Sequence, residues 1–170
     1  MTVKPRQPTP PLEVRLLDGG TWRLADAKPP TFEMIVVYRG LHCPICKTYL
    51  GDLETKLPEF AKRGVNVIAV STDDHDRARR AKSEWHLNDL LVGCELPIAG
   101  AREWGLFISR AIREGEPPEF SEPGLFLVRP DGTLFYAARS SAPWGRPPFD
   151  QMLRGIDLVK ERKMPARGEA

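Results

Sequence analysis

The feature that most constrains this chain is the apolar run Met34 to Tyr38, followed after a short loop by Cys43-Pro44-Ile45-Cys46. The run is rich in β-branched residues, which predicts a central strand buried on both faces. From Ile45 onward, apolar residues recur at spacings of four and three, which is typical of a helix. The cysteine motif is therefore predicted to lie where a strand passes into a helix.

This junction predicts a reactive sulfur. Pro44 suits the first helical position, where its missing N–H is not needed. Because a residue before proline is disfavoured in the α region, we expect Cys43 to be the helix cap. Unpaired backbone N–H groups and the helix dipole favour the thiolate there, lowering a cysteine pKa from ~8.5 to roughly 3.5–7.5. Cys46 lies in the first turn on the same side and can resolve a mixed disulfide. We expect Cys43 to be the nucleophile, reachable from solvent, and Cys46 the resolving cysteine.

Other interpretations of the two cysteines remain open. They could be half of a zinc site, but the sequence contains no second Cys-x-x-Cys and no His-x-x-x-His, so we expect no metal. They could also be inert core cysteines, which is the interpretation we favour for Cys94. His42 could stabilise a Cys43 thiolate by its positive charge, or it could be an exposed loop residue.

Composition limits the class of protein. The 170 residues suffice for one domain with a substantial core, and 41% hydrophobic with 28% charged residues is typical of a soluble protein. The net charge of +2 is too small to indicate nucleic-acid binding, and no apolar segment reaches the ~20 residues that span a bilayer. The N-terminus lacks the apolar region of a secretory signal, and three cysteines do not suggest a disulfide framework. We expect a cytoplasmic protein that binds neither nucleic acid nor membrane and needs no cofactor.

The order of predicted elements indicates an α/β fold. A disordered Pro-rich lead-in (1–11) precedes one domain (12–163) and a tail (164–170). Within the domain we expect a hairpin of two strands at 12–17 and 21–24, buried strands at 32–38 and 65–70, a short apolar segment at 90–95, and a further strand pair at 125–128 and 133–138. We expect helices at 44–63, from Asp73 or Asp74 through His86, over 98–113, and at 149–163. Strand, long helix and strand over 32–70 form a right-handed βαβ unit.

This layout resembles the thioredoxin fold, and within it the AhpC/TSA, or peroxiredoxin-like, branch. The N-terminal hairpin and the segments Val67-Ile-Ala-Val-Ser and Gly124-Leu-Phe-Leu-Val-Arg-Pro-Asp-Gly carry the resemblance, together with Cys-Pro-Ile-Cys. It implies a central mixed sheet with helices on both faces, and it spans roughly residues 12–160.

Two positions depart from the peroxidases of that family. Those enzymes carry Thr or Ser three residues before the peroxidatic cysteine and Arg just before the Gly-Leu-Phe strand. Aligned on Cys43, this chain has Gly40 at the first position and Pro123 at the second. Thioredoxin-like reductases keep a cis proline at the second position, where it shapes the edge that docks substrate, so we expect a cis Glu122–Pro123 bond. Arg39 or Thr48 could replace the missing peroxide contacts, although an arginine at a strand end is usually solvated.

The sequence thus leaves three hypotheses in order. The first is a thiol–disulfide oxidoreductase that uses Cys43, Cys46 and Pro123, with His42, Pro44, Arg39 and Thr48 as supporting residues. The second is a thiol peroxidase acting on hydroperoxides. The third is a non-catalytic, redox-sensing interaction module. The expected partner of either enzyme is a disulfide or thiol reductant such as a thioredoxin or glutathione system.

Overall fold

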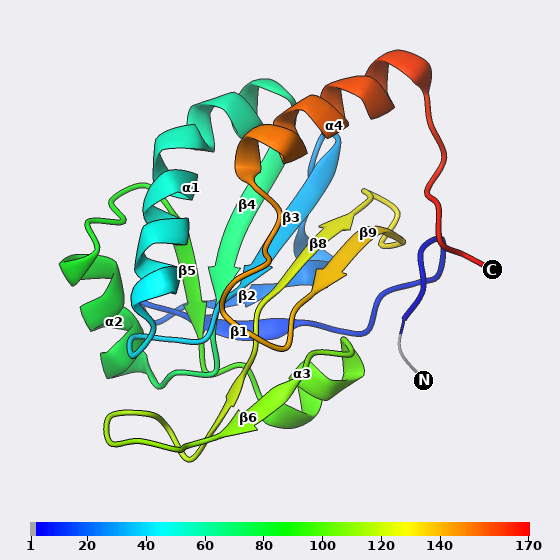
Figure 1. Cartoon of the computed structure of the whole chain (residues 1–170). Coiled ribbons are helices and arrows are strands. Elements are labelled where there is room, and N and C mark those ends of the chain that lie inside the picture. Colours follow the sequence, from blue (N-terminus) through cyan, green and yellow to red (C-terminus); the bar gives the residue numbers. More distant parts are fainter. Residues whose placement is uncertain (1–2) are drawn as a thin grey trace.

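A seven-stranded mixed sheet forms the centre of the molecule in the computed structural model, which describes residues 3–170 (Figure 1). The strand order is β2-β1-β5-β4-β3-β8-β9, and a separate two-stranded sheet pairs β6 with β7. The strands are β1 (Glu13–Leu16), β2 (Thr21–Arg23), β3 (Phe32–Val37), β4 (Val65–Val70), β5 (Leu91–Cys94), β6 (Ile108–Arg110), β7 (Glu119–Ser121), β8 (Gly124–Val128) and β9 (Leu134–Arg139). The helices are η1 (Leu24–Asp26), α1 (Pro44–Lys62), α2 (His75–Glu84), α3 (Ile98–Glu103) and α4 (Phe149–Arg162).

The central strand is β3, as its apolar run predicts. All six of its residues are buried, and it pairs parallel with β4 and antiparallel with β8. Ile35, for example, lies between Ile68 on β4 and Phe126 on β8. Because a strand in this position is covered on both faces, apolar side chains are favoured along its whole length.

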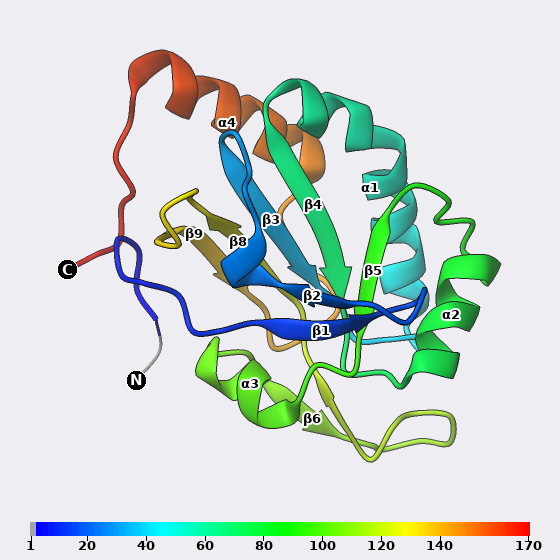
Figure 2. The same ribbon diagram turned by 180° about the vertical axis from the view of Figure 1, so that it is seen from behind.

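Helices cover both faces of the sheet, which confirms the predicted thioredoxin-like architecture. On one face, α1, α2 and α4 pack with residues such as Met34, Leu50 and Phe149 in one core cluster (Figure 1). On the other face, Trp104 at the end of α3 packs against Ile35 in a second cluster. The N-terminal hairpin β1–β2 joins the sheet through β5 and lies on the near side of the molecule in Figure 2.

The predicted helix over 98–113 is wrong beyond its first part. α3 ends at Glu103, and Gly105 adopts φ +73°, a left-handed conformation that stops a helix. Ile108–Arg110 then pairs antiparallel with Glu119–Ser121 to form a hairpin beside the end of the sheet. The pairing supplies backbone hydrogen bonds that outweigh the weak helical pattern of this segment.

The lead-in is ordered where it is described, instead of disordered. The Arg6 N–H donates to the carbonyl of Leu134 at 2.8 Å, and Thr9 donates to that of Gly132 at 3.0 Å. Arg6 also donates to the carbonyl of Ala166 at 2.9 Å, so the two ends of the chain lie side by side (Figures 1 and 2). Residues 1–2 of the predicted lead-in lie outside the described residues.

Candidate active site

The loop between β3 and α1 is held in one conformation by a buried carboxylate. The backbone N–H of Leu41 donates to Asp73 Oδ2 at 2.8 Å, and the side chain of Asp73 is fully buried. Gly40 has φ +128°, and a Cβ at this position would lie 2.6 Å from Asp73 Oδ1. Only glycine fits so close to the carboxylate in this backbone conformation. The loop therefore delivers Cys43 to the start of α1 in a fixed place.

Cys43 caps α1, as its position before Pro44 predicts. Its backbone is extended, with φ −108° and ψ 101°, and Pro44 occupies the beginning of the helix. The Cys43 sulfur accepts a hydrogen bond from the backbone N–H of Cys46 at 3.2 Å. A cap sulfur in this geometry satisfies one of the free donors of the first turn and gains from the helix dipole as an anion.

The two sulfurs divide into a thiolate and a thiol. The hydrogen bond from the Cys46 side chain is the largest cause that lowers the pKa of Cys43, followed by the Cys46 N–H and the charges of Arg146 and Arg39. Together they outweigh burial and bring the pKa of Cys43 to about 6. Burial, and then the bond it makes to Cys43, raise the pKa of Cys46. At neutral pH the pair therefore holds one negative charge, centred on Cys43, and both cysteines are reduced.

Both cysteines are closed off from solvent, contrary to the expectation of a reachable Cys43. Cys43 is 1% exposed and Cys46 is fully buried, and both belong to the core cluster that contains Leu50. The sequence motif indicates the cap position but not what the rest of the fold places over it. Any reaction at these sulfurs requires a local movement that admits the oxidant.

Arg39 forms a buried ion pair and is not the solvated strand-end charge that its position suggests. Its Nε lies 3.1 Å from Glu122 Oε2, and the two side chains are 13% and 4% exposed. The two atoms face each other without hydrogen-bond alignment. The guanidinium lies 4.8 Å from the ring centroid of Phe120, and the other Glu122 oxygen accepts from Ser109 at 2.6 Å. Arg39 thereby joins the active loop to β7.

His42 is neutral and does not supply the positive charge considered for it. Burial, and then the charges of Arg39 and Arg77, lower its pKa to about 4. Its ring packs edge-on against Phe120 at 4.5 Å between centroids, and its Nδ1 lies 3.4 Å from an Arg77 nitrogen. Arg77 in turn donates to Asp73 at 3.0 Å. His42 therefore packs the loop against Phe120 and does not act as a positive charge beside the thiolate.

Arg146 is the main site residue that sequence reasoning missed. It lies between β9 and α4, and its Nη1 is 3.4 Å from the Cys46 sulfur. Its guanidinium lies 4.4 Å from the ring centroid of Tyr49, whose hydroxyl donates to the carbonyl of Pro147 at 2.7 Å. Within residues 3–170 no carboxylate forms an ion pair with Arg146. The sequence signal was weak, because an arginine in a Pro- and Gly-rich loop is usually a surface residue.

The expected cis bond before Pro123 is wrong, because residues 3–170 contain no cis peptide. The Glu122 N–H donates to the carbonyl of Phe107 at 2.8 Å, and the carbonyl of Pro123 accepts from Ser140 at 3.0 Å. These bonds carry an extended chain from β7 into β8. Pro123 is buried and lines a small hollow together with Tyr49 and Arg146. Arg146 thus lies beside the position where the resemblance placed an arginine of the peroxidases.

Thr48 is not part of the site. It is exposed on α1, and its hydroxyl donates to the carbonyl of Pro44 at 3.4 Å, a bond within its own helix. Cys94 belongs to the same core cluster as Cys43 and Cys46, but it is carried by β5 instead of α1. It is fully buried on β5, burial raises its pKa to about 11, and its thiol donates to the carbonyl of Arg15. Among the described residues no three His, Cys, Asp or Glu side chains come together as metal ligands.

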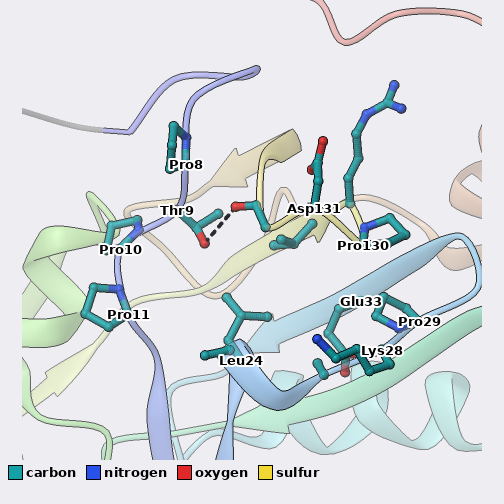
Figure 3. A pocket seen from close by; sticks show the side chains of 15 residues that line it. Pro8, Thr9, Pro10, Pro11, Leu24, Lys28, Pro29, Glu33, Pro130 and Asp131 are labelled. Atoms are coloured by element: carbon teal, nitrogen blue, oxygen red, sulfur yellow. Dashed lines mark hydrogen bonds between the residues drawn. The ribbon is translucent and has the colours of Figure 1, made fainter.

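A cleft that is separate from the dithiol lies at the opposite end of β3. It measures about 390 Å³ and has prolines on several sides, among them Pro8, Pro10 and Pro130 (Figure 3). Glu33, at the start of β3, contributes to its lining, whereas the dithiol follows the other end of that strand. The cleft contains no cysteine, so the chemistry of the chain is concentrated at the α1 end.

Comparison with known proteins identifies the family of the chain. The sequence model of the AhpC/TSA family matches residues 5–137, which include both cysteines. The chain belongs to the AhpC/TSA family. A 1-Cys peroxiredoxin of Dirofilaria immitis is 29% identical over 133 residues, and peroxiredoxin-6 of Homo sapiens is 28% identical over 159 residues.

These relatives are longer than the chain. The matches cover 69% and 86% of this chain but 56% and 65% of the two relatives. The fold is shared with solved structures at lower identity. A cysteine-to-serine mutant of peroxiredoxin 6 of Arenicola marina matches with a TM-score of 0.78 at 20% identity, over 95% of this chain and 76% of that one. A peroxiredoxin-like protein of Aquifex aeolicus gives 0.75 at 17% identity, over 94% and 89%.

Within the described residues, no helix combines the length and the apolar character needed to cross a bilayer.

Proposed function

We propose that this chain is a thiol-dependent peroxidase that reduces hydroperoxides with the Cys43–Cys46 dithiol. The observation that carries the proposal is a sulfur with a pKa of about 6, hydrogen-bonded to a second thiol, in a chain of the AhpC/TSA family. A thiolate is the form of cysteine that attacks an electrophilic oxygen, and at neutral pH this one is already ionised. The charge of Arg146 beside the pair supports both the thiolate and the negative charge that develops on the leaving oxygen.

The Cys43 thiolate attacks the terminal oxygen of ROOH, the O–O bond breaks, and the leaving RO⁻ takes a proton to become ROH. Cys43 is now a sulfenic acid. The Cys46 sulfur attacks it, an S–S bond forms, and the hydroxyl leaves with the Cys46 proton as water. A dithiol, or two thiols, of a thioredoxin or glutathione system then supplies two electrons and two protons to restore the pair.

This proposal reverses the order that the sequence suggested, in which disulfide reduction stood first. Two findings support the change. Membership of the AhpC/TSA family and the names of the relatives favour hydroperoxide chemistry. The peptide before Pro123 is not cis, which removes the feature that pointed to a docking edge for protein disulfides. Because a dithiol must be regenerated in each cycle, we propose that the protein works in a reducing compartment such as the cytoplasm.

One contact favours the opposite order of the two cysteines. Arg146 Nη1 lies 3.4 Å from Cys46, and Cys43 precedes Cys46 by three residues, the spacing at which the family's peroxidases place their Thr or Ser. In this second assignment Cys46 attacks the peroxide and Cys43 resolves the sulfenic acid. The net reaction is the same, so the assignment concerns roles and not substrate.

Single substitutions separate the two assignments. Reduced Cys43→Ser and Cys46→Ser variants are treated with one equivalent of hydrogen peroxide, and sulfenic acid is trapped with dimedone and located by mass spectrometry. If Cys43 attacks, Cys46→Ser accumulates trapped sulfenic acid at Cys43 and Cys43→Ser accumulates little, and the second assignment predicts the reverse. Cys94→Ser is the matched control and should react like the wild type. Oxidation of the wild type no faster than that of free cysteine would contradict the peroxidase proposal under either assignment.

A further inference from the structure

A buried carboxylate without a hydrogen-bond donor lies in the cleft at the start of β3, at the end of that strand away from the dithiol. Glu33 is 3% exposed and lines this cleft, which has a volume of about 390 Å³. Its Oε2 atom is buried and accepts no hydrogen bond within residues 3–170. A buried acceptor that has lost its water and gained no partner is costly, so the free oxygen indicates a donor that the chain itself does not supply.

Prolines line the cleft on several sides. Pro8, Pro10 and Pro11 come from the lead-in, Pro29 from the segment before β3, and Pro130 from the turn between β8 and β9 (Figure 3). Proline has no backbone N–H, so these walls cannot donate to Glu33, and each ring presents a rigid apolar face. Such walls favour a flat, largely apolar ligand that brings its own N–H donor.

The cleft is already formed in the free chain. The Thr9 hydroxyl donates to the carbonyl of Gly132 at 3.2 Å, the contact drawn as a dashed line in Figure 3. The backbone N–H of Thr9 donates to the same carbonyl at 3.0 Å, and that of Arg6 donates to Leu134. These bonds fix the lead-in against the β8–β9 turn, so a ligand would enter a site whose walls are in place.

Glu33 is the one carboxylate of the lining without a hydrogen bond among the described residues. The other, Asp131, accepts from the Thr133 N–H at 3.0 Å and from the Thr133 hydroxyl at 2.6 Å. One free carboxylate is too few for a hard cation such as Ca²⁺, which takes six to eight oxygen ligands. An organic N–H donor is therefore a better match for Glu33 than a metal ion.

Lys28 supplies a positive charge to the same cleft. Its side chain is exposed, and it forms no ion pair within residues 3–170. The guanidinium of Arg129, which also belongs to the lining, lies 4.9 Å from the ring centroid of Phe135. A free lysine disfavours a cationic ligand and favours one that carries an anionic group.

We propose that the cleft is a binding site for a heteroaromatic molecule that donates an N–H to Glu33 Oε2, packs its ring against the prolines and places an anionic group beside Lys28. A purine nucleotide combines these three properties, because its base carries N–H donors on a flat ring and its phosphate is an anion. The site is independent of the proposed peroxidase function, since neither Cys43 nor Cys46 lines the cleft.

Calorimetric titration of the reduced full-length chain tests the site with three probes. Guanosine 5′-monophosphate has the ring, the N–H donors and the anion, guanosine lacks the anion, and inorganic phosphate lacks the ring. We expect the nucleotide to bind most tightly, guanosine more weakly, and phosphate not measurably. No binding of the nucleotide, or equal binding of phosphate alone, would overturn the proposal.

Substitution of Glu33 separates a binding role from a structural one. Glu33→Leu should weaken nucleotide binding by about tenfold or more, the scale of a lost hydrogen bond to a charged group. Its free energy of unfolding should equal or exceed that of the wild type, because an apolar side chain relieves the unpartnered oxygen. Glu33→Gln keeps the shape of the side chain and should show a smaller loss of affinity. Unchanged binding in either variant contradicts the proposal.

Lys28→Met tests the position of the anionic group. It should weaken binding of the nucleotide by about threefold, as expected for an exposed charge pair, and leave guanosine unchanged. Lys47→Met is the matched control, because Lys47 is also exposed but is not part of the cleft lining, and it should change neither affinity. Equal effects of the two substitutions would place the anion elsewhere and refute this arrangement.

Discussion

Arginines flank the dithiol on two sides, and the two sides are built differently. On the side of β7 and α2, Arg39 pairs with the buried Glu122 and Arg77 with the buried Asp73. On the side of α4, Arg146 has an aromatic ring and a sulfur for neighbours and no carboxylate within the described residues that forms an ion pair with it. On the first side each arginine is paired with a carboxylate, although the charge of Arg39 still helps to lower the pKa of Cys43. On the second side the charge of Arg146 acts on the sulfurs without a carboxylate partner among the described residues.

The comparison shows that arginines near the dithiol have two roles, one structural and one chemical. A neutralised arginine contributes geometry, because its carboxylate partner also holds the loop, as Asp73 does through the Leu41 N–H. An arginine without a carboxylate stabilises an anion in a site of low dielectric, where one charge has a large effect. Substitutions on the first side should therefore affect mainly stability, and those on the second side mainly reactivity.

The largest effect should follow from removal of Asp73. Asp73→Ala leaves Arg77 without its partner and the Leu41 N–H without its acceptor, and losing one partner of a buried pair costs about 3–5 kcal/mol. Asp74→Ala is the control, since it removes only the cap of α2 at about 1 kcal/mol. Urea unfolding of the reduced proteins gives both free energies. Equal losses would show that Asp73 does no more than an ordinary helix cap.

The next effect concerns Arg146. Arg146→Met keeps much of the side-chain length but removes the charge beside the sulfurs, so the reaction with hydrogen peroxide at neutral pH should slow by about a hundredfold. The free energy of unfolding should change by less than about 1 kcal/mol, because no ion pair is broken. Stopped-flow kinetics with Arg146→Lys as the control should show partial recovery. A variant that reacts at the wild-type rate would remove Arg146 from the chemistry.

The pH dependence should follow the thiolate. Because the pKa of Cys43 is lowered to about 6, the fraction ionised is half at that pH and rises above it. The rate of oxidation by hydrogen peroxide should therefore increase through pH 6 and level off at neutral pH. The same shift contributes to stability above the pKa of the unfolded thiol, and that contribution is lost as pH falls through 6. Ultraviolet absorbance of the thiolate in Cys94→Ser measures the midpoint, and a midpoint near that of free cysteine contradicts the assignment.

The smallest effect should come from an exposed pair that has no part in the comparison. Arg80 and Glu84 on α2 meet at 3.1 Å, but their side chains are 60% and 52% exposed. Arg80→Met should change the free energy of unfolding by less than about 0.5 kcal/mol, since solvent screens such pairs. Urea unfolding of Arg80→Met and Asp73→Ala under the same conditions compares the free energy lost with an exposed and with a buried carboxylate–arginine pair. A loss as large as that of Asp73→Ala would remove the distinction.

Local pattern was enough to predict most of the fold. The apolar run of β3, the cap at Cys43 and the period of α1 each depend on neighbours in sequence, and the structure has all three where they were expected. The segment after Glu103 failed because strand pairing with residues 119–121 decides its structure, and that pairing is not visible in the segment itself.

The site was only half predictable for the same reason. The sequence places Cys43 and Cys46 together because they share one helical turn. Arg146 stands 100 residues from Cys46, and only the packing of the loop before α4 brings them together. The burial of Arg39 was missed because its partner, Glu122, directly follows β7, and the pairing of β7 with β6 is not visible in the local sequence.

The closed position of the two sulfurs has a consequence for speed and selectivity. Because Cys43 is only 1% exposed, it can react only when the surrounding structure opens locally. The opening step would then limit the rate of turnover, and turnover would slow in viscous solvent. The same burial excludes large disulfide compounds from the thiolate as long as the site is closed.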